Sequence, residues 1–366
     1  MKKLSIIVFI LFFNLLLPKM VFAQDNLKQT QPQVFKAEIM EIIPESGQDR
    51  QQHLKVKLLS GQRQGEEASA AAAFDKSAVN DFKKGQKVIV RQIELSGHKE
   101  LIVTDFLRTD SFWAIGLIFV LAVVLVSQKK GVSSLLSLGL SFVVIIKLIL
   151  PLLIKGVSPV LISSLGALLI IPLTFYLSHG LKKKSHVAVV GTIVALVLSS
   201  VLANLFINNA HLTGFSSEEA SFLDIEKGGE LNIKGLLLAS IIIGLLGTLD
   251  DITVTQSGLV FQLNENKKNL SPKKLFQQAM AIGQDHIASM VNTLVLVYTG
   301  AALPLLMIFI DNPYPAWYVI NQEIVAEEII RMLVGSIGLI VAAPLTTLLA
   351  VGLVKKEKLS SLVNIR

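Results

Sequence analysis

The chain contains no cysteine. This absence excludes disulfide bonds, thiolate catalysis and cysteine-ligated metal sites. Charged residues are also scarce, at 17% of the sequence, whereas hydrophobic residues make up 52%. An average soluble protein has about a quarter charged residues. The hydrophobic excess lies in residues 112–354, so the composition predicts a membrane-embedded part that follows a more polar segment, residues 24–110.

Two common catalytic motifs are missing as well. The sequence has neither the phosphate-binding pattern G-x-x-x-x-G-K-[ST] nor the zinc-binding pattern H-E-x-x-H, which excludes a P-loop ATPase and a zincin. We expect no catalytic site, metal or cofactor, and favour a protein that is not an enzyme. The net charge of +7 does not indicate nucleic-acid binding, because lysines between apolar runs orient a protein in the bilayer. The expected partner is therefore the lipid bilayer.

The N-terminus has the form of a secretory signal peptide. Lys2 and Lys3 precede the apolar run Leu4–Leu17, and Val21-Phe22-Ala23 gives a small-residue cleavage pattern. We predict that residues 1–23 are removed after Ala23. The alternative is an uncleaved anchor, but the apolar run is shorter than the roughly 20 residues that a span needs.

Residues 24–110 show the alternation of β-strands. Leu54, Val56 and Leu58 alternate with lysines, and residues 87–93 and 101–103 follow the same pattern. We predict a small extracytoplasmic barrel or sandwich of about five strands. The stretch Gly61–Ala73, rich in Gln, Ala and Glu, is expected to be a loop or a short helix.

Residues 111–366 form the expected transmembrane domain, a mostly α-helical bundle of about seven spans. Basic residues gather in the predicted inner segments and acidic residues in the predicted outer loops. By the positive-inside rule, this places the N-terminal domain outside and the C-terminus in the cytoplasm. The apolar runs are Phe112–Ser127, Val132–Ile154, Val157–Ser178, Val187–Ile207, Gly235–Leu263, Ile287–Ile310 and Ile324–Val354.

Polar residues interrupt the fifth and sixth runs. At 100° per residue, Thr248, Asp251 and Thr255 share one face of the fifth run with Gly244, whereas Asp250 points elsewhere. A charged residue at this depth is costly and usually functional. In the sixth run, Asp285, Ser289 and Asn292 share a face. We predict that Asp251, Thr255, Asp285 and Asn292 form a proton or cation path, supported by Thr248, Asp250 and Ser289. The alternative is that these groups only hold helices together.

The seventh run begins with charged residues. Glu328 and Arg331 are spaced to form an ion pair, and carboxylates such as Glu323 suit a helix N-terminus. We include all three as possible supporting site residues, with an interfacial cap as the alternative interpretation. Gly335 and Gly338 are predicted to permit close helix packing.

Several stretches together resemble one family. They are Gly244-x-x-Gly247-x-x-x-Asp251, Gly283-x-Asp285-x-x-x-Ser289-x-x-Asn292, Asn321-x-Glu323-x-x-Ala326-Glu327-Glu328, and His211-Leu212-Thr213-Gly214. The pattern is similar to the YibE/F-like membrane protein family from about Trp113 to Val354. The resemblance implies a bacterial multi-pass membrane protein with an exported β-rich part and without a settled activity. It places the family's aspartate on Asp251; Asp250 and Ser289 depart from the family pattern.

Three functions remain open at this point. The first is a permease or efflux component of the cell membrane that uses the polar residues within the spans. The second is a non-catalytic scaffold, for which a second membrane protein of the same family is a candidate partner. The third is an intramembrane aspartyl protease with Asp251 and Asp285 as its acid pair, which lacks the usual Gly-x-Gly-Asp context.

Overall fold

The computed structural model describes residues 33–43, 52–72, 82–95, 98–267, 270–310 and 314–363. The chain divides into two compact units with their boundary between Ala122 and Val123, and each is described by itself. The predicted signal peptide, residues 1–23, lies outside the described residues.

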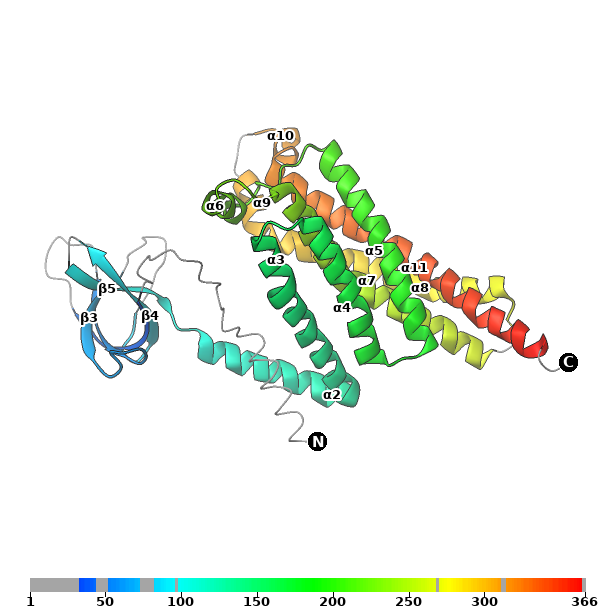
Figure 1. Ribbon diagram of the computed structural model, residues 1–366, viewed down its shortest axis with the longest axis horizontal. Helices are drawn as coiled ribbons and strands as arrows, with labels where there is room; N and C mark the ends of the chain where they lie inside the picture. The colour runs from blue at the N-terminus through cyan, green and yellow to red at the C-terminus, as the bar shows by residue number, and fades with distance from the viewer. Residues whose placement is uncertain are drawn as a thin grey trace. The chain divides into compact units, whose positions relative to one another are not determined.

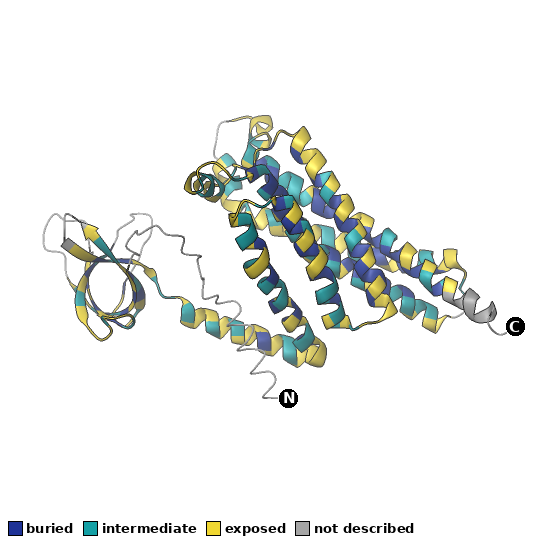
Figure 2. Cartoon of the chain, viewed as in Figure 1, coloured by how far each residue is buried: buried dark blue, intermediate teal, exposed yellow. Residues whose placement is uncertain are grey.

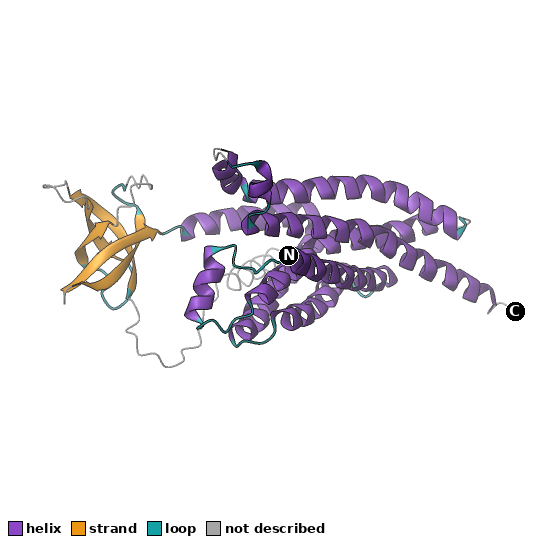
Figure 3. Ribbon diagram, turned by 90° about the horizontal axis from the view of Figure 1, so that it is seen from above, coloured by secondary structure: helices purple, strands orange, loops and turns teal. Residues whose placement is uncertain are grey.

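The first unit contains a closed barrel of five strands, shown in orange in Figure 3. Its strands are β1 (Val34–Ile43), β2 (Gln52–Leu58), β3 (Glu67–Ala72), β4 (Lys87–Leu95) and β5 (His98–Phe106). They are arranged in the order β1-β2-β3-β5-β4, with β3 and β5 parallel and the other pairs antiparallel. This is the arrangement of an OB-type barrel.

The barrel core follows the alternation in the sequence. Leu54, Val56 and Leu58 are fully buried, whereas Lys55 and Lys57 between them are exposed. The prediction for Gly61–Ala73 was wrong in its second half, because residues 67–72 form β3. Alanine has a low strand propensity, but Ala70 pairs with Leu54 of β2 and lies inside the barrel, so packing overrides the local preference.

The remaining chain is helical. Its elements are α2 (Thr109–Val144), η1 (Ile145–Ile149), α3 (Leu150–Ile154), α4 (Pro159–His179), α5 (Lys183–Asn209), α6 (Glu218–Glu226), α7 (Ile233–Asn266), α8 (Pro272–Ala301), α9 (Leu303–Ile310), α10 (Ala316–Ile320) and α11 (Glu323–Val363). Figure 1 shows the short helices α6, α9 and α10 gathered at one end of the long ones. A mostly α-helical membrane bundle with an N-terminal β domain is thus confirmed.

The number of spans differs from the expected seven. Within the described residues, five helices are long and apolar enough to cross a membrane, or six when the bent pair α8 and α9 counts as one span. The first two apolar runs share the helical stretch Thr109–Ile154, which is broken at Gln128 (φ 50°, ψ −127°). Counting seven requires the arms on either side of Gln128 to cross separately, and Phe112–Ser127 alone is shorter than the roughly 20 residues of a span.

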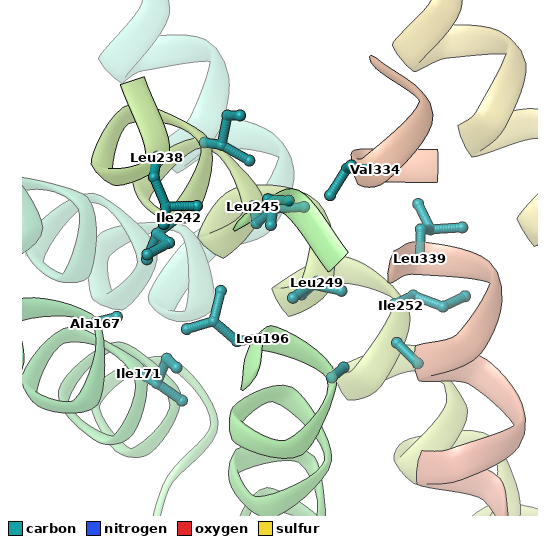
Figure 4. Packing of buried hydrophobic residues seen from close by; sticks show 14 of the residues in the cluster. Ala167, Ile171, Leu196, Leu238, Ile242, Leu245, Leu249, Ile252, Val334 and Leu339 are labelled. Atoms are coloured by element: carbon teal, nitrogen blue, oxygen red, sulfur yellow. The ribbon is translucent and has the colours of Figure 1, made fainter. Parts of the chain in front are cut away.

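Helix α7 is the centre of the bundle and packs against α4, α5, α8 and α11. Leu238, Ile242, Leu245, Leu249 and Ile252 are buried at helical spacing along it (Figure 4). Figure 2 shows buried residues running through the middle of the long helices. Polar side chains strengthen these contacts: the buried hydroxyl oxygens of Thr192 on α5 and Thr253 on α7 are 2.6 Å apart. Ser257 on α7 donates to the Lys184 carbonyl at 2.7 Å.

Glycines set the approach of α5 and α11. A Cβ at Gly338 would lie 2.3 Å from the Ser199 hydroxyl oxygen, which confirms the expected close packing there. A Cβ at Gly191 would lie 2.4 Å from Oγ1 of Thr346 and 3.2 Å from its Cβ. Thr346 is fully buried, so its side chain has little room to yield.

We expect Gly191→Ala to destabilise the protein by up to about 2 kcal/mol, since overpacking costs about 1–3 kcal/mol and helix propensity returns about 1 kcal/mol. The measurement is the thermal unfolding midpoint of the purified protein in detergent. Gly352→Ala is the matched control, because nothing lies within 4 Å of its Cβ; it should leave the midpoint unchanged or raise it. Equal midpoints for the two variants would contradict this account.

Candidate functional site

The polar stripe of α7 lies on an exposed face of the described chain. Asp251 and Thr255 are exposed and Thr248 is half-buried. The opposite side of α7 carries Thr253 and Gln256, both fully buried between helices. An aspartate facing lipid near the middle of a span costs about 2.5–3.5 kcal/mol even on the lenient insertion scale. This face of α7 therefore requires water or another protein surface beside it.

Helix α8 also carries its predicted site residues on an exposed face. Asp285, Ser289 and Asn292 are all exposed. His286 is half-buried, lies within electrostatic range of Asp251, and has a buried Nε2 without a hydrogen-bond partner in the described chain. The structure thus brings a histidine of α8 to the α7 stripe.

Asp251 and Asn292 do not line a common cavity among those described here. Asn292 lines a groove of about 520 Å³ between α8 and α11, together with Gln284. Asp251 and Asp285 are not among its lining residues, and no hydrogen bond joins their two carboxyl groups in the described chain. The continuous path through all four residues remains a prediction.

The contact between α7 and α8 depends on a buried amide. The side-chain oxygen of Gln256 accepts a hydrogen bond from Thr347 of α11 at 3.1 Å. A Cβ at Gly283 of α8 would lie 1.9 Å from the Gln256 amide nitrogen. The absence of a side chain at Gly283 therefore leaves space for the Gln256 side chain, and this steric requirement explains the glycine at this position.

The largest cavity described here lies at the end of the bundle that carries α6 and α9. It has a volume of about 550 Å³, and its walls come from α6, α7, α8, α9, α11 and the loop before α6. Leu236, Leu237 and Leu305 contribute apolar surface. The polar lining residues are Ser216, Ser217, Ser240, Tyr298, Glu327, Glu328 and Arg331. We call this space the α11 cavity.

Three charged residues from one turn of α11 line this cavity. The Arg331 guanidinium donates to the Glu328 carboxylate at 2.7 Å, which confirms the spacing argument for that pair. Glu327 is only 5% exposed; the Ser216 side chain lies close to its carboxyl group, but its Oε1 has no hydrogen-bond partner in the described chain. Arg331 Nε is likewise buried without a partner there. With all three groups ionised, the lining carries a net charge of −1.

Glu323 joins two distant segments at the edge of this cavity. Its carboxylate accepts hydrogen bonds from the backbone N–H and hydroxyl of Thr213 and from the N–H of Gly214. The hydroxyl bond is 2.8 Å long and the Gly214 bond 2.9 Å. Glu323 therefore ties the α5–α6 loop to the first turn of α11. We call this set of hydrogen bonds between Glu323, Thr213 and Gly214 the Glu323 clasp. Gly214 also lines the α11 cavity.

Asp250 lies on a different side of α7 from Asp251. It lines a separate cavity of about 320 Å³ between α2, α4 and α7. We call this the α4 cavity.

A family model for YibE/F-like proteins matches residues 115–356. The chain belongs to the YibE/F-like protein family. The matched region includes all the residues that line the two cavities and none of the barrel strands. Comparisons with curated proteins and with solved structures gave no match. Together with the apolar helices, the family identifies the chain as a membrane protein.

Sequence reasoning underestimated two residues of this YibE/F-like domain. Glu327 was not among the predicted site residues, yet the structure buries it beside the cavity. Asp250 was given a supporting role, yet it is the residue of the Asp250–Asp251 pair that lines a cavity. A sequence signal existed for the second: Ser134, Ser137 and Ser141 repeat at three- and four-residue spacing in an otherwise apolar helix and so share one face.

Proposed function

We propose that this YibE/F-like membrane protein is a permease or efflux component for small cationic or zwitterionic solutes. The α11 cavity carries the proposal: its volume of about 550 Å³ is within the usual range for a small-molecule site. Its apolar walls are combined with a few polar groups, as in typical ligand pockets. In the proposed orientation this cavity opens toward the outside of the cell membrane, and the C-terminus lies in the cytoplasm.

The charges of the α11 cavity support the proposed solute class. With Glu327 ionised, two carboxylates and one guanidinium leave an excess of one negative charge, which favours a positively charged group. Glu328 already neutralises Arg331, so Glu327 is the carboxylate available for the solute. A buried carboxyl oxygen without a partner costs about 1–3 kcal/mol, and a solute ammonium group would supply the missing donor.

The exposed face of α7 supports a role in moving charge through the bundle. Ser240 lines the α11 cavity, and Asp251 lies eleven residues further along α7, about 16 Å along the helix axis. Asp251 on α7 and His286 on α8 lie within electrostatic range of each other. We propose that they couple solute movement to protons.

The test uses the full chain in proteoliposomes. A panel of labelled solutes (lysine, arginine, putrescine, choline and glycine betaine) is assayed for uptake and for efflux, with and without a proton gradient. We expect at least one to be transported above the rate of empty liposomes. Failure of every solute under every gradient would overturn the proposal.

For the solute that is transported, we expect Asp251→Asn to reduce proton-driven flux at least tenfold. The exposed position of Asp251 means that the variant should keep the unfolding midpoint of the wild type. Glu226→Gln serves as a matched control, because it also neutralises a carboxylate, and Glu226 is exposed at the end of α6 without a proposed role. Undiminished flux in Asp251→Asn would exclude Asp251 from the coupling.

The exposed polar faces of α7 and α8 also favour the scaffold as a second candidate. Asp251 and Asn292 would be satisfied by a neighbouring membrane protein, such as another member of the family. If the protein is a scaffold, we expect no solute flux in proteoliposomes. We also expect cysteines introduced at positions 251 and 292 to form cross-links to a co-purified membrane protein. The arrangement of Asp251 and Asp285 does not favour a protease. The two carboxyl groups of an aspartyl protease share a proton, and no hydrogen bond joins these two in the described chain.

A further inference from the structure

We propose that the α4 cavity is a binding site for a monovalent alkali cation, with Asp250 as its charged ligand. The cavity is separate from the α11 cavity: Ser240 and Asp250, on α7, line one each. They are ten residues apart, which is about 15 Å along the helix. Asp250 is seventeen residues from Ile233, the first residue of α7, so it lies near the middle of this helix.

The polar wall of the cavity consists of oxygen atoms from three helices. Ser134, Ser137 and Ser141 come from α2, Thr174 and Ser178 from α4, and Asp250 from α7. Asp250 is the one charged group among the described lining residues. Its carboxyl group is half-buried, and the described chain provides neither a hydrogen bond nor an ion pair to it.

The hydrogen bonds of these hydroxyl groups determine what they can offer to a ligand. Ser137 donates to the Thr174 carbonyl at 3.0 Å, and Ser141 donates to the Ser137 carbonyl at 3.1 Å. Thr174 donates to the Ile171 carbonyl at 3.0 Å. A hydroxyl has one hydrogen and two lone pairs, so each of these groups has already used its hydrogen. The three oxygens can therefore present only acceptor lone pairs.

The cavity therefore offers three acceptor oxygens and one carboxylate, beside the hydroxyls of Ser134 and Ser178, and none of its described lining residues is positively charged. Hard cations bind to oxygen ligands of this kind. A single carboxylate balances one positive charge, while neutral hydroxyl oxygens complete the coordination; a divalent ion would leave a net charge in a low-dielectric region, which is costly. The volume of about 320 Å³ also leaves room for several waters, each occupying about 30 Å³.

The site does not depend on the proposed transport function, and it can be tested by binding alone. The full chain in detergent is heated in NaCl, KCl or N-methylglucamine chloride at equal ionic strength. A cation that binds the folded protein raises the unfolding midpoint in a saturable way. We expect NaCl or KCl to raise the midpoint above that in N-methylglucamine chloride.

Asp250→Asn should weaken the apparent cation affinity at least tenfold, whereas Asp224→Asn should leave it unchanged. Asp224 is the matched control because it is the same residue type, lies on α6 and does not line the α4 cavity. If Asp250→Asn fails to fold, Ser141→Ala is the second variant; it removes one oxygen and should weaken the affinity severalfold.

Three outcomes would overturn the inference. The first is an equal midpoint in all three salts. The second is an apparent cation affinity that is unchanged in Asp250→Asn, or in Ser141→Ala where that variant is used. The third is a midpoint that depends on pH through Asp250 but not on the alkali cation, which would assign the carboxyl group to a proton instead.

Discussion

Glu327→Gln is expected to raise the KM of the transported solute at least tenfold in proteoliposomes. The substitution preserves the size of the side chain and removes the charge that we assign to a solute ammonium group. Loss of a charge-assisted hydrogen bond costs about 1.5–3 kcal/mol, and each 1.4 kcal/mol is a factor of ten in affinity. The maximal rate should fall less than the affinity, since Glu327 binds the solute and lies apart from the Asp251 face.

Glu226→Gln is the control for this measurement. Glu226 is exposed at the end of α6 and does not line the α11 cavity, so its removal changes the net charge by the same amount without touching the site. A KM for Glu327→Gln equal to that of Glu226→Gln would mean that Glu327 does not contact the solute. The unfolding midpoints of both variants separate a binding defect from a folding defect.

Glu323→Ala should cause the largest loss of stability among the substitutions considered. The carboxylate accepts two backbone N–H groups and one hydroxyl from the α5–α6 loop. A hydrogen bond to a charged group contributes about 1.5–3 kcal/mol. Glu323 is half-buried and water can replace part of the lost bonding, so we expect a net loss of about 2–3 kcal/mol.

This loss would be measured as a lower unfolding midpoint, together with faster proteolysis of the α5–α6 loop. Glu323→Gln keeps an acceptor oxygen and should lose less than Glu323→Ala. Glu226→Ala, which removes an exposed carboxylate, should change neither quantity. An Ala variant at position 323 as stable as Glu226→Ala would show that the clasp contributes little to the fold.

The Glu323 clasp is a contact that the sequence pattern does not predict. His211-Leu212-Thr213-Gly214 and Asn321-x-Glu323 both belong to the pattern that resembles the family. Their spacing in the chain says nothing about contact, because Thr213 and Glu323 are 110 residues apart. Only the fold shows that one stretch holds the other.

The sequence by itself determined the period-two alternation of the barrel and the apolar runs of the bundle. Both depend on which residues avoid water, and this property belongs to each residue. The same reasoning found the helix faces: Asp251 and Thr255 share one exposed face, and Asp250 points away from it, because helical geometry is fixed at 100° per residue. The spacing of Glu328 and Arg331 likewise predicted an ion pair that the structure contains.

Only the tertiary structure decided what each face meets. Ala70 and Ala72 lie in a strand because β2 and β5 pair with β3, a contact that local propensity does not encode. Asp250 and Asp251 are neighbours in the sequence, but α4 packs against α7, and residues of α2 complete a hydroxyl-lined cavity at Asp250. Glu327 lines a cavity because α6, α8 and α9 close over the first turns of α11. Such roles depend on contacts between distant segments, and these form only when the whole bundle packs.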